Sequence, residues 1–512
     1  MSWNYQSSFE RIQKYLGALG EIQVEKLVRD AELYTLLTPT NCRQIYGAHV
    51  YVDVPNFALL TTQGEGEDYR RVIQAIHLYH REVARIVEDP EVFDGVRIHF
   101  QGPKLHGLFF RPIDSTQELA IKAVLLQMVL RHFVANVFNL AFPLLPNLTV
   151  AGGADLGYAI GTKNGMEGDR ELLFLGAPAN YAAKIVGAPG QINLTGQVFS
   201  GLPRKLRDLC SPLQEGLYQI GATSSGAIAE LLGEFGIGWD SKDSAERLEE
   251  DKRLFPLKTI EYSEADSPIN LDDLGITNNK RVRAASLFAD VSGFTKYIDA
   301  ARTADDRKRA LRVFHVVRKE MAEVVKHDFS GLRIQYQGDR VQALFHLPKN
   351  DDAAFLKKAI EAAAGLQSSM EYTLKQCFPE AGGLGIAIGI DLDVTLVSKI
   401  GTRGQRDRIC IGTGVENAAR TQEKSNGGEV SLTPRAFQVL DALLQRQFTL
   451  DKTRNLYVAT KFYSDRFERA AKAAVYCVGG PVTVQSASKT VTVTHGEEAG
   501  GRQVFPSKTY AC

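Results

Sequence analysis

The feature that most constrains the fold of this chain is an internal repeat. Gly102 and Gly176 are 74 positions apart, and Gly338 and Gly412 have the same separation. Equal separations in two parts of one chain indicate two copies of one structural unit. The length of 512 residues also suits two or three domains. We therefore predict a duplicated domain.

An apolar run that ends in an aspartate opens each copy. In the second copy, Ala284 to Ala289 is typical of a buried strand, and Asp290 follows it directly. In the first copy, Tyr46 to Phe57 has the same pattern, and Asp53 matches Asp290. Each copy is thus predicted to deliver one carboxylate at the end of a buried strand.

A second carboxylate is present in only one copy. The segment Gln337 to Arg340 is typical of a hairpin turn between two strands, and it contains Asp339. Asp290 and Asp339 on adjacent strands could hold a pair of divalent metal ions. The alternative is that Asp290 only caps a helix and Asp339 only makes a turn. The first copy has Pro103 at the matching position, so it keeps one of the two carboxylates.

Four segments of the second copy together resemble the catalytic domain of class III nucleotidyl cyclases, the adenylate and guanylate cyclase family. In chain order they are Leu287 to Thr295, Gln337 to Arg340, Gly385 to Asp391 and Ile411 to Arg420. That family shows a strand ending in Asp-x-x-Gly-Phe-Thr, a Gly-Asp hairpin and a Gly-x-x-Val-Asn-x-Ala-x-Arg helix. The order and spacing of the four segments make the resemblance specific. It implies an α+β fold, with two ferredoxin-like cyclase domains in tandem that pair as a pseudo-heterodimer.

The resemblance also implies how the active site is divided. Members of the family build each site across a head-to-tail pair of domains, in which one domain donates the aspartates and the other an asparagine and an arginine. Here the second domain would supply Asp290 and Asp339 as metal ligands, with the backbone carbonyl of Val291 as a further ligand. The first domain would supply Asn180 for the ribose and Lys184 in place of the arginine. A lysine offers a point charge where arginine offers a planar fork.

This division leaves a degenerate second site that holds Asp53, Glu416 and Arg420. The competing arrangement is a dimer of two chains, in which Asp290, Asp339 and Arg420 act together. In that arrangement Glu416 would stand where the family has asparagine and would repel the triphosphate. We therefore favour the intramolecular pair, with a homodimer as an additional arrangement and Arg420 as a further candidate catalytic residue.

The positions that select the base in the family carry neither purine pattern. Gln335 and Ile409 occupy them in the second domain, and His99 and Leu173 occupy them in the first. His99 could pair with a pyrimidine edge, and Phe100 could fill the space that a smaller ring leaves. The alternative is that both are ordinary strand residues. The five residues are our candidates for base binding.

The expected function is the cyclisation of a nucleoside triphosphate to a 3′,5′-cyclic nucleotide with two divalent ions, Mn²⁺ or Mg²⁺. The altered base pocket resembles the bacterial pyrimidine cyclases of Pycsar antiphage systems, which make cyclic UMP or cyclic CMP as a messenger for a separate effector. We favour UTP slightly over CTP. The alternatives are a soluble bacterial adenylate cyclase and a pair of nucleotide-binding regulatory modules without turnover.

The overall charge gives no indication of a nucleic-acid or membrane partner. Lys and Arg (60) balance Asp and Glu (60), so no net field favours nucleic acid or an anionic membrane. The six cysteines lack paired spacing, which suits reduced thiols in the cytoplasm. The apolar segment Leu119 to Leu145 is interrupted by Lys122 and Arg131, so we predict a core helix rather than a membrane span.

We expect five segments along the chain. They are a helical arm (1–44), a degenerate cyclase-like domain (45–236), a linker (237–280), a catalytic cyclase domain (281–450) and a C-terminal extension (451–512). The arm shows helical patterns at Phe9 to Leu19 and Val24 to Leu37, which suit a docking or dimerisation element. Lys242 to Arg253 is predicted to be an exposed linker helix. In the extension we predict a helix at Ser464 to Val475 and a hairpin at Val482 to Val493.

Overall fold

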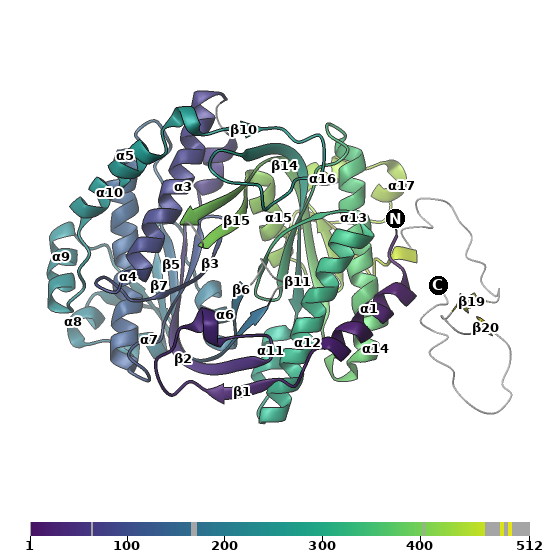
Figure 1. Ribbon diagram of the computed structural model, residues 1–512, viewed down its shortest axis with the longest axis horizontal. Helices are drawn as coiled ribbons and strands as arrows, with labels where there is room; N and C mark the ends of the chain where they lie inside the picture. The colour runs from purple at the N-terminus through teal and green to yellow at the C-terminus, as the bar shows by residue number, and fades with distance from the viewer. Residues whose placement is uncertain are drawn as a thin grey trace.

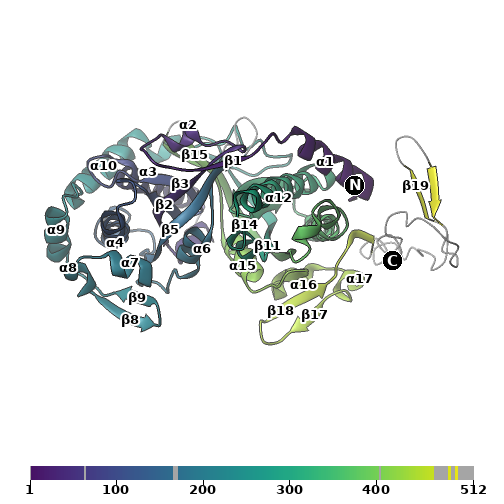
Figure 2. The same cartoon turned by 90° about the horizontal axis from the view of Figure 1, so that it is seen from below.

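The computed structural model describes residues 2–62, 65–164, 171–402 and 405–465, together with two short strands, β19 (Val482–Gln485) and β20 (Thr490–Val493). We call residues 2–236 the first half and residues 237–465 the second half. The two halves lie side by side, and each consists of a sheet with helices packed against it (Figures 1 and 2). The predicted α+β fold and the tandem pairing are confirmed.

The first half is built on a nine-stranded sheet, counted over the part of the chain that the structure describes. Its path is β3-β4-β2-β5-β7-β9-β8, with β1 beside β2 and β6 beside β5. The strands are β1 (Gln23–Lys26), β2 (Asn41–Asp53), β3 (Val96–Gln101), β4 (Lys104–Phe109), β5 (Ala151–Asn164), β6 (Glu171–Leu175), β7 (Ile192–Thr195), β8 (Cys210–Gln214) and β9 (Leu217–Ile220). The helices are α1 (Tyr5–Ala18), α2 (Leu33–Leu36), α3 (Glu67–Glu88), α4 (Thr116–Phe133), α5 (Asn139–Ala141), α6 (Ala177–Lys184), α7 (Gly196–Gly201), α8 (Arg204–Arg207) and α9 (Ser225–Glu234).

The second half repeats this topology strand for strand over its own described residues. Its path is β12-β13-β11-β14-β16-β18-β17, with β10 beside β11 and β15 beside β14. The strands are β10 (Tyr262–Ser263), β11 (Asn279–Ser292), β12 (Leu332–Gln337), β13 (Arg340–Phe345), β14 (Gly385–Thr402), β15 (Gln405–Ile411), β16 (Glu429–Leu432), β17 (Thr449–Asp451) and β18 (Leu456–Thr460). The helices are α10 (Ser241–Leu254), α11 (Phe294–Asp299), α12 (Ala304–Glu323), α13 (Asp352–Ser368), α14 (Lys375–Cys377), α15 (Thr413–Glu423), α16 (Pro434–Val439) and α17 (Ala442–Gln445).

The two halves exchange their longest β-hairpins. The β5–β6 hairpin places Ile160, Leu173 and Leu175 in the apolar core that surrounds α12 of the second half. The β14–β15 hairpin places Ile400 and Ile409 in the core that surrounds α3 of the first half. Because each core is completed by the other half, the apolar interface holds the two sheets together.

The apolar segment that we predicted as a core helix is α4, and the helix continues through a π turn to Ala141. Within the described ranges, Thr116–Ala141 is the one helix long and apolar enough to cross a membrane by length and composition. The window that meets this criterion is 78% buried inside the protein. Burial at this level is typical of a core helix.

Three local predictions have clear outcomes. The helix at Phe9 to Leu19 is confirmed by α1, and the hairpin at Val482 to Val493 is confirmed by the pairing of β19 with β20. The helix at Val24 to Leu37 is wrong, because β1 pairs in parallel with β2 and only the short α2 follows. Here tertiary strand pairing overrides local helix propensity. The predicted helix at Ser464 to Val475 lies mostly outside the described residues.

The linker helix is present but is not simply exposed. It is α10, and Ser244, Leu248 and Asp251 on one of its faces are buried. This face packs against α3 of the first half. The prediction of a solvated helix is therefore corrected. The periodicity of a charged segment did not reveal this packing partner, because two of the three buried residues are polar.

Candidate active site

A cavity of about 860 Å³ lies between the two halves. Asp290, Val291 and Asp339 of the second half line it, together with Asn180 and Lys184 of the first half. These are the five residues that the sequence assigned to one composite site. The pairing of the two halves within one chain is thus sufficient to bring these five residues to one cavity.

The two aspartates reach the cavity from adjacent strands. Asp290 lies near the end of β11, and Asp339 lies in the turn between β12 and β13, which pair with each other and, through β13, with β11. Gly338 in that turn has a φ of +69°, a conformation that favours glycine. Removal from bulk water raises the pKa of both carboxyl groups, and the charge of Asp290 raises the pKa of Asp339 further.

This carboxylate pair suits divalent cations. Two acidic groups that share a shielded cavity repel each other, and a bound cation removes that repulsion. The backbone of Val291 lies beside them and offers a carbonyl oxygen. Within the described ranges, no group of three or more His, Cys, Asp or Glu side chains is arranged to hold a metal. Ligands beyond the two aspartates would therefore come from the backbone, solvent or substrate.

The first half contributes one face of helix α6 to the wall of the cavity. Asn180 and Lys184 are four positions apart, so their side chains lie on the same face. Nδ2 of Asn180 donates a hydrogen bond of 3.0 Å to Oγ1 of Thr295 in the second half. The charges of Arg340 and Lys184 oppose the rise in the pKa of Asp290. The arrangement places an amide and a cation opposite the two carboxylates.

The sequence analysis did not assign several further cationic side chains to this cavity. Lys296, Arg340 and Lys104 line it, and so does Arg420, which the sequence analysis had named as a candidate catalytic residue. Lys296 directly follows the Gly-Phe-Thr motif and Arg340 directly follows Asp339, so their adjacency to the motifs is the signal that could have identified them. Together with Lys184 they make this part of the cavity suitable for a polyphosphate.

Uncharged side chains, most of them aromatic rings, also line the cavity. His99 and Leu173, two of the candidates for base binding, lie there with Tyr51 and His106 beside them. The ring of Tyr51 stacks on that of His106 at 4.2 Å, and the Tyr51 hydroxyl lies 3.1 Å from Nδ1 of His106. Burial lowers the pKa of His99 to about 3, and the charges of Arg318, Arg97 and Arg340 contribute. The imidazole is therefore neutral near pH 7.

Tyr51 and His106 could have been found from strand register. Tyr51 precedes Asp53 by two positions, so both side chains leave β2 on one face. Tyr51 pairs with His106 across the β2–β4 ladder, and His106 pairs with His99 across the β3–β4 ladder. The sequence analysis did not derive this register.

Three base-binding predictions are corrected by the structure. Phe100 is 1% exposed and lies in the apolar core with its ring 4.0 Å from that of His80. Gln335 is buried and donates a hydrogen bond of 3.2 Å to Gln342. Ile409 lies in the core around α3. None of the three lines the 860 Å³ cavity.

A smaller cavity of about 190 Å³ occupies the position of the degenerate site. Its lining includes Asp53, Lys104, Glu416 and Arg420. Nζ of Lys104 lies 3.2 Å from Oδ2 of Asp53, and Arg420 forms an ion pair with Glu416. The charged groups thus pair with one another, so Asp53 has an internal counter-ion. Arg420 lines both cavities.

Comparison with known proteins agrees with this geometry. Residues 278–480 match the family described as the adenylate and guanylate cyclase catalytic domain. A protein of Pseudomonas aeruginosa named uridylate cyclase is 30% identical over 92% of this chain and 93% of its own length. The chain belongs to the class III nucleotidyl cyclase family. Members of this family generally depend on divalent metal ions.

Two further relatives extend the comparison. A protein of a Rhizobium species, also named uridylate cyclase, is 27% identical over 80% of this chain and 81% of its own length. The crystal structure of a class III adenylyl cyclase-like ATP-binding protein from Pseudomonas aeruginosa superimposes with a TM-score of 0.78. That alignment covers 92% of this chain and 99% of the other, at 26% identity. The tandem architecture therefore recurs in a solved structure.

Proposed function

We propose that this cyclase converts UTP to 3′,5′-cyclic UMP and pyrophosphate at the composite cavity. The observation that carries the proposal is the meeting of Asp290 and Asp339 with Asn180 and Lys184 in one cavity. The names of the two relatives that align with most of the chain support the choice of base.

The reaction joins the ribose 3′ oxygen to the α-phosphorus. A new P–O bond forms, the bond from the α-phosphorus to the bridging oxygen breaks, pyrophosphate leaves, and the hydroxyl proton passes to solvent. Asn180 would orient the ribose, and the ammonium of Lys184 would stabilise negative charge that develops on the phosphoryl oxygens. Lys296 and Arg340 would bind the remaining phosphates.

Asp290, Asp339 and the carbonyl of Val291 would hold two divalent ions, Mn²⁺ or Mg²⁺. Bound ions of this kind lower the pKa of the attacking hydroxyl and neutralise the leaving pyrophosphate. The two aspartates then act as ligands rather than as general bases. Arg420 is a second candidate for phosphate contact, because it lines the same cavity.

The base would bind among the uncharged rings. His99 is neutral, and Nε2 of Gln101 donates a hydrogen bond of 2.8 Å to its Nε2. The proton of the ring is therefore on Nδ1, which would donate to the edge of the base. Leu173 would pack against the ring of the base. Losing such a hydrogen bond in a shielded site costs about 1–3 kcal/mol, which is enough for selection among nucleotides.

The direct test offers each of the four nucleoside triphosphates with Mn²⁺ to the purified protein and identifies products by mass spectrometry. We expect cyclic UMP as the main product. Cyclic AMP as the main product would favour an adenylate cyclase, and the solved relative is described as adenylyl cyclase-like and ATP-binding. No product from any triphosphate would favour a nucleotide-binding regulatory pair.

The cyclic nucleotide would serve as a second messenger that acts on a separate effector. This part of the proposal rests on the resemblance to the antiphage pyrimidine cyclases. Cyclic UMP that accumulates in infected cells and is absent from uninfected ones would support it. Equal amounts in both would contradict it.

A further inference from the structure

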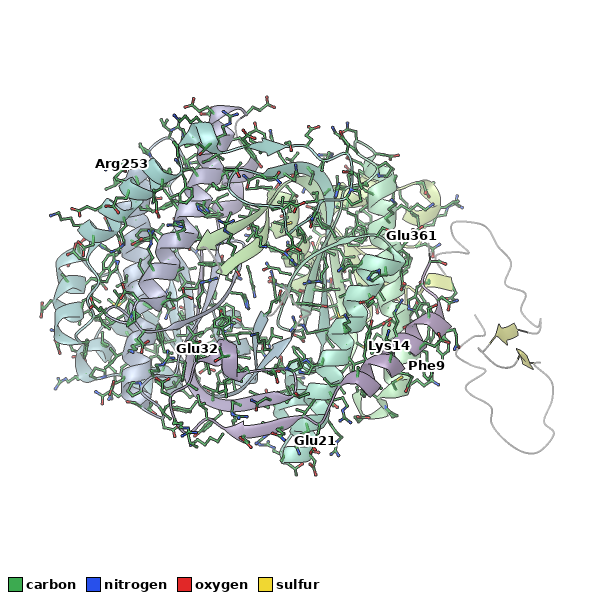
Figure 3. The ribbon with its side chains drawn as sticks, viewed as in Figure 1. Phe9, Lys14, Glu21, Glu32, Arg253 and Glu361 are labelled. Atoms are coloured by element: carbon green, nitrogen blue, oxygen red, sulfur yellow. The ribbon has the colours of Figure 1, made fainter. Side chains whose placement is uncertain are left out.

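The helix that leads each half packs on the other half. Helix α1 lies against α12 of the second half, and α10 lies against α3 of the first half (Figure 1). Phe9 and Lys14 on α1 accordingly appear at the outer edge of the second half, whereas Arg253 on α10 appears at the outer edge of the first (Figure 3). The exchange of hairpins is thus accompanied by an exchange of leading helices.

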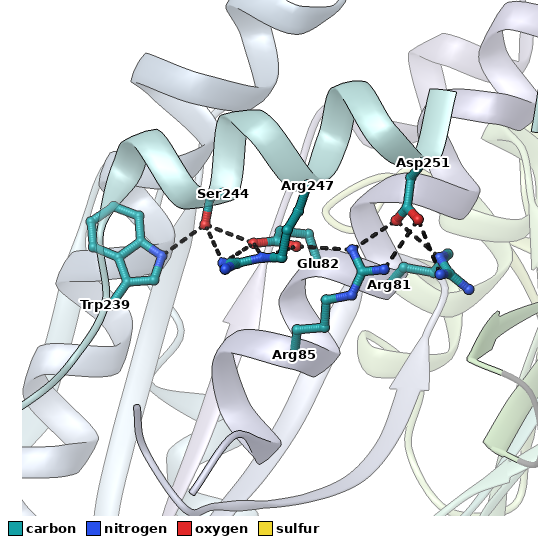
Figure 4. A network of polar contacts seen from close by, with 7 residues as sticks. All are labelled: Arg81, Glu82, Arg85, Trp239, Ser244, Arg247 and Asp251. Carbon is teal, nitrogen blue, oxygen red and sulfur yellow. Dashed lines mark hydrogen bonds and ion pairs between the residues drawn. The ribbon is translucent and has the colours of Figure 1, made fainter. Parts of the chain in front are cut away.

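Helix α10 is held on α3 by a buried carboxylate, Glu82. Ser244 Oγ donates to Oε1 of Glu82 at 2.6 Å, and Nη2 of Arg247 donates to the same oxygen at 2.6 Å (Figure 4). Nε1 of Trp239 donates to Ser244 Oγ at 3.0 Å. The Glu82 side chain has no exposed surface. We call these four residues the Glu82 clasp.

Helix α1 is held on α12 in the same way by Glu320. Ser8 Oγ donates to Oε1 of Glu320 at 2.7 Å, and Nη2 of Arg11 donates to that oxygen at 2.7 Å. Nη1 of Arg11 also donates to Asp328 at 2.7 Å. The Glu320 side chain is fully buried as well. We call Ser8, Arg11, Asp328 and Glu320 the Glu320 clasp.

The two clasps have the same arrangement of a serine and an arginine around a buried glutamate. Ser8 and Ser244 differ by 236 positions, and so do Arg11 and Arg247. Each serine precedes its arginine by three positions, so both side chains lie on one helix face. A buried carboxylate without its cation is costly, so each clasp fixes its leading helix in one place.

Of the two clasps, the Glu320 clasp is the one connected to the larger cavity, through α12 and the β5–β6 hairpin. Helix α12 also contacts the β5–β6 hairpin, through His315 at 3.3 Å from Thr162 and through a hydrogen bond of 3.1 Å from Arg318 to Glu171. Leu173, two positions after Glu171 on β6, lines the cavity where the uncharged rings lie. Helix α12 is therefore held between α1 and the strand that carries Leu173.

The Glu82 clasp has the matching position on the degenerate side. Helix α3 contacts β14 of the exchanged β14–β15 hairpin. That hairpin carries Cys410 and Ile411, which line the 190 Å³ cavity. The same arrangement is thus present twice, and each copy is connected to one cavity through an exchanged hairpin.

We propose that Arg11 is a positioning residue for the nucleotide base. Through Glu320 it fixes α12, and through α12 it fixes the β6 wall against which the base packs. This inference rests on the proposed function, because it concerns the same cavity. Arg247 performs the same task beside the degenerate cavity and has no effect on the substrate.

The test compares Arg11→Ala with its matched control Arg247→Ala in the full chain, by steady-state kinetics with UTP and Mn²⁺. We expect Arg11→Ala to raise KM about tenfold with kcat changed less than about twofold, since a contact made equally in ground and transition states is weakened. Arg247→Ala should change neither constant by more than about twofold. Arg11→Lys keeps the charge but cannot bridge both carboxylates, so its KM should be intermediate.

Equal KM values for Arg11→Ala and the wild type, or equal increases for both alanine variants, would overturn the inference. If Arg11→Ala does not fold, the double variant Arg11→Ala/Glu320→Gln removes the buried charge with its partner, and Arg247→Ala/Glu82→Gln is its control. A wild-type protein that forms no cyclic nucleotide would contradict the proposed function instead, so the two failures are distinguishable.

Discussion

At the residue scale, one substitution removes the second carboxylate from the first half. Pro103 in the first half stands where the second half has Asp339, and Lys104 supplies Asp53 with a counter-ion at 3.2 Å. An ammonium beside a carboxylate removes the need for a metal ion at that position. Among the described residues, Asp290 and Asp339 have no ion pair of this kind, and the charge of Asp290 makes Asp339 harder to ionise. The chain therefore concentrates its unbalanced negative charge in one cavity.

Asp339→Ala should abolish turnover without unfolding the protein. The expected loss in kcat/KM is at least about a hundredfold, as for removal of a group that stabilises transition-state charge. Thermal stability should stay equal or rise, because the variant loses a carboxylate whose pKa is raised by burial and by Asp290. Asp53→Asn is the matched control and should retain activity. Full activity in Asp339→Ala would contradict the metal assignment.

His99 and Phe100 provide a second test, because neighbours on a strand point to opposite faces. His99→Ala should raise KM for UTP about tenfold, since it removes one hydrogen-bonding partner of the base. Phe100→Leu should lower stability, because Phe100 lies in the core, and should leave KM unchanged. The measurements are steady-state kinetics and urea denaturation of both variants. A KM that changes only in Phe100→Leu would place the base elsewhere.

At the element scale, the interface between the two halves consists of the exchanged hairpins, and an ion pair with a buried arginine holds each hairpin on the opposite half. Arg97 on β3 donates to Asp407 on β15 at 2.5 Å. Arg318 on α12 donates to Glu171 on β6 at 3.1 Å. Both arginine side chains are nearly buried, at 4% and 1% exposure. Because a buried guanidinium requires a counter-charge, each pair restricts how its hairpin can sit on the other half.

Asp407→Ala should lower the free energy of unfolding by about 3 kcal/mol, since it removes the closest carboxylate from buried Arg97. Urea denaturation near neutral pH measures the change. Glu230→Ala, which breaks an exposed ion pair with Lys205, is the control and should have no measurable effect. In a double-mutant cycle, adding Arg97→Met should recover much of the loss. Equal stability of Asp407→Ala and the wild type would show that the pair does not anchor the hairpin.

At the scale of the whole molecule, buried histidines couple the fold to pH. Burial lowers the pKa of four of them to about 3, namely His49, His77, His99 and His315. An unfolded histidine has a pKa of about 6.5. Between these values the unfolded chain binds more protons than the folded one, so stability rises with pH. The contribution is fully present above about pH 6.5 and is lost as the pH falls towards 3.

Each such histidine should contribute a slope of about 1.4 kcal/mol per pH unit below pH 6.5. Buried carboxyl groups with a raised pKa, such as Asp339 and Asp407, act in the opposite direction. The histidine contribution is therefore measured by comparing urea midpoints of the wild type and a histidine variant at about pH 7.5 and about pH 5.5. His77→Phe removes one titrating ring, whose nitrogens have no hydrogen-bond partner among the described residues, and should weaken the pH dependence by one such slope. The same pH dependence in His77→Phe and in the wild type would contradict this prediction.

The sequence alone determined the duplication, the strand that delivers Asp290, the hairpin that carries Asp339 and the helix face that carries Asn180 and Lys184. These features follow from local patterns. The alternation of apolar and polar residues in a strand, the glycines in turns and the spacing of residues on one helix face all extend over only a few residues. The sequence also shows Pro103 in place of the second carboxylate, and this predicts that the second half supplies the metal ligands.

Only the tertiary structure decided which strand faces reach the cavity and which half each segment packs against. Phe100 and Ile409 were assigned to the base because they occupy or adjoin family positions, yet one faces the core of its own half and the other fills the core of the opposite half. The clasps of α1 and α10 join residues more than 150 positions apart, such as Ser244 and Glu82 with a separation of 162. Contacts at that range depend on how two finished domains dock, and a local pattern carries no information about that docking.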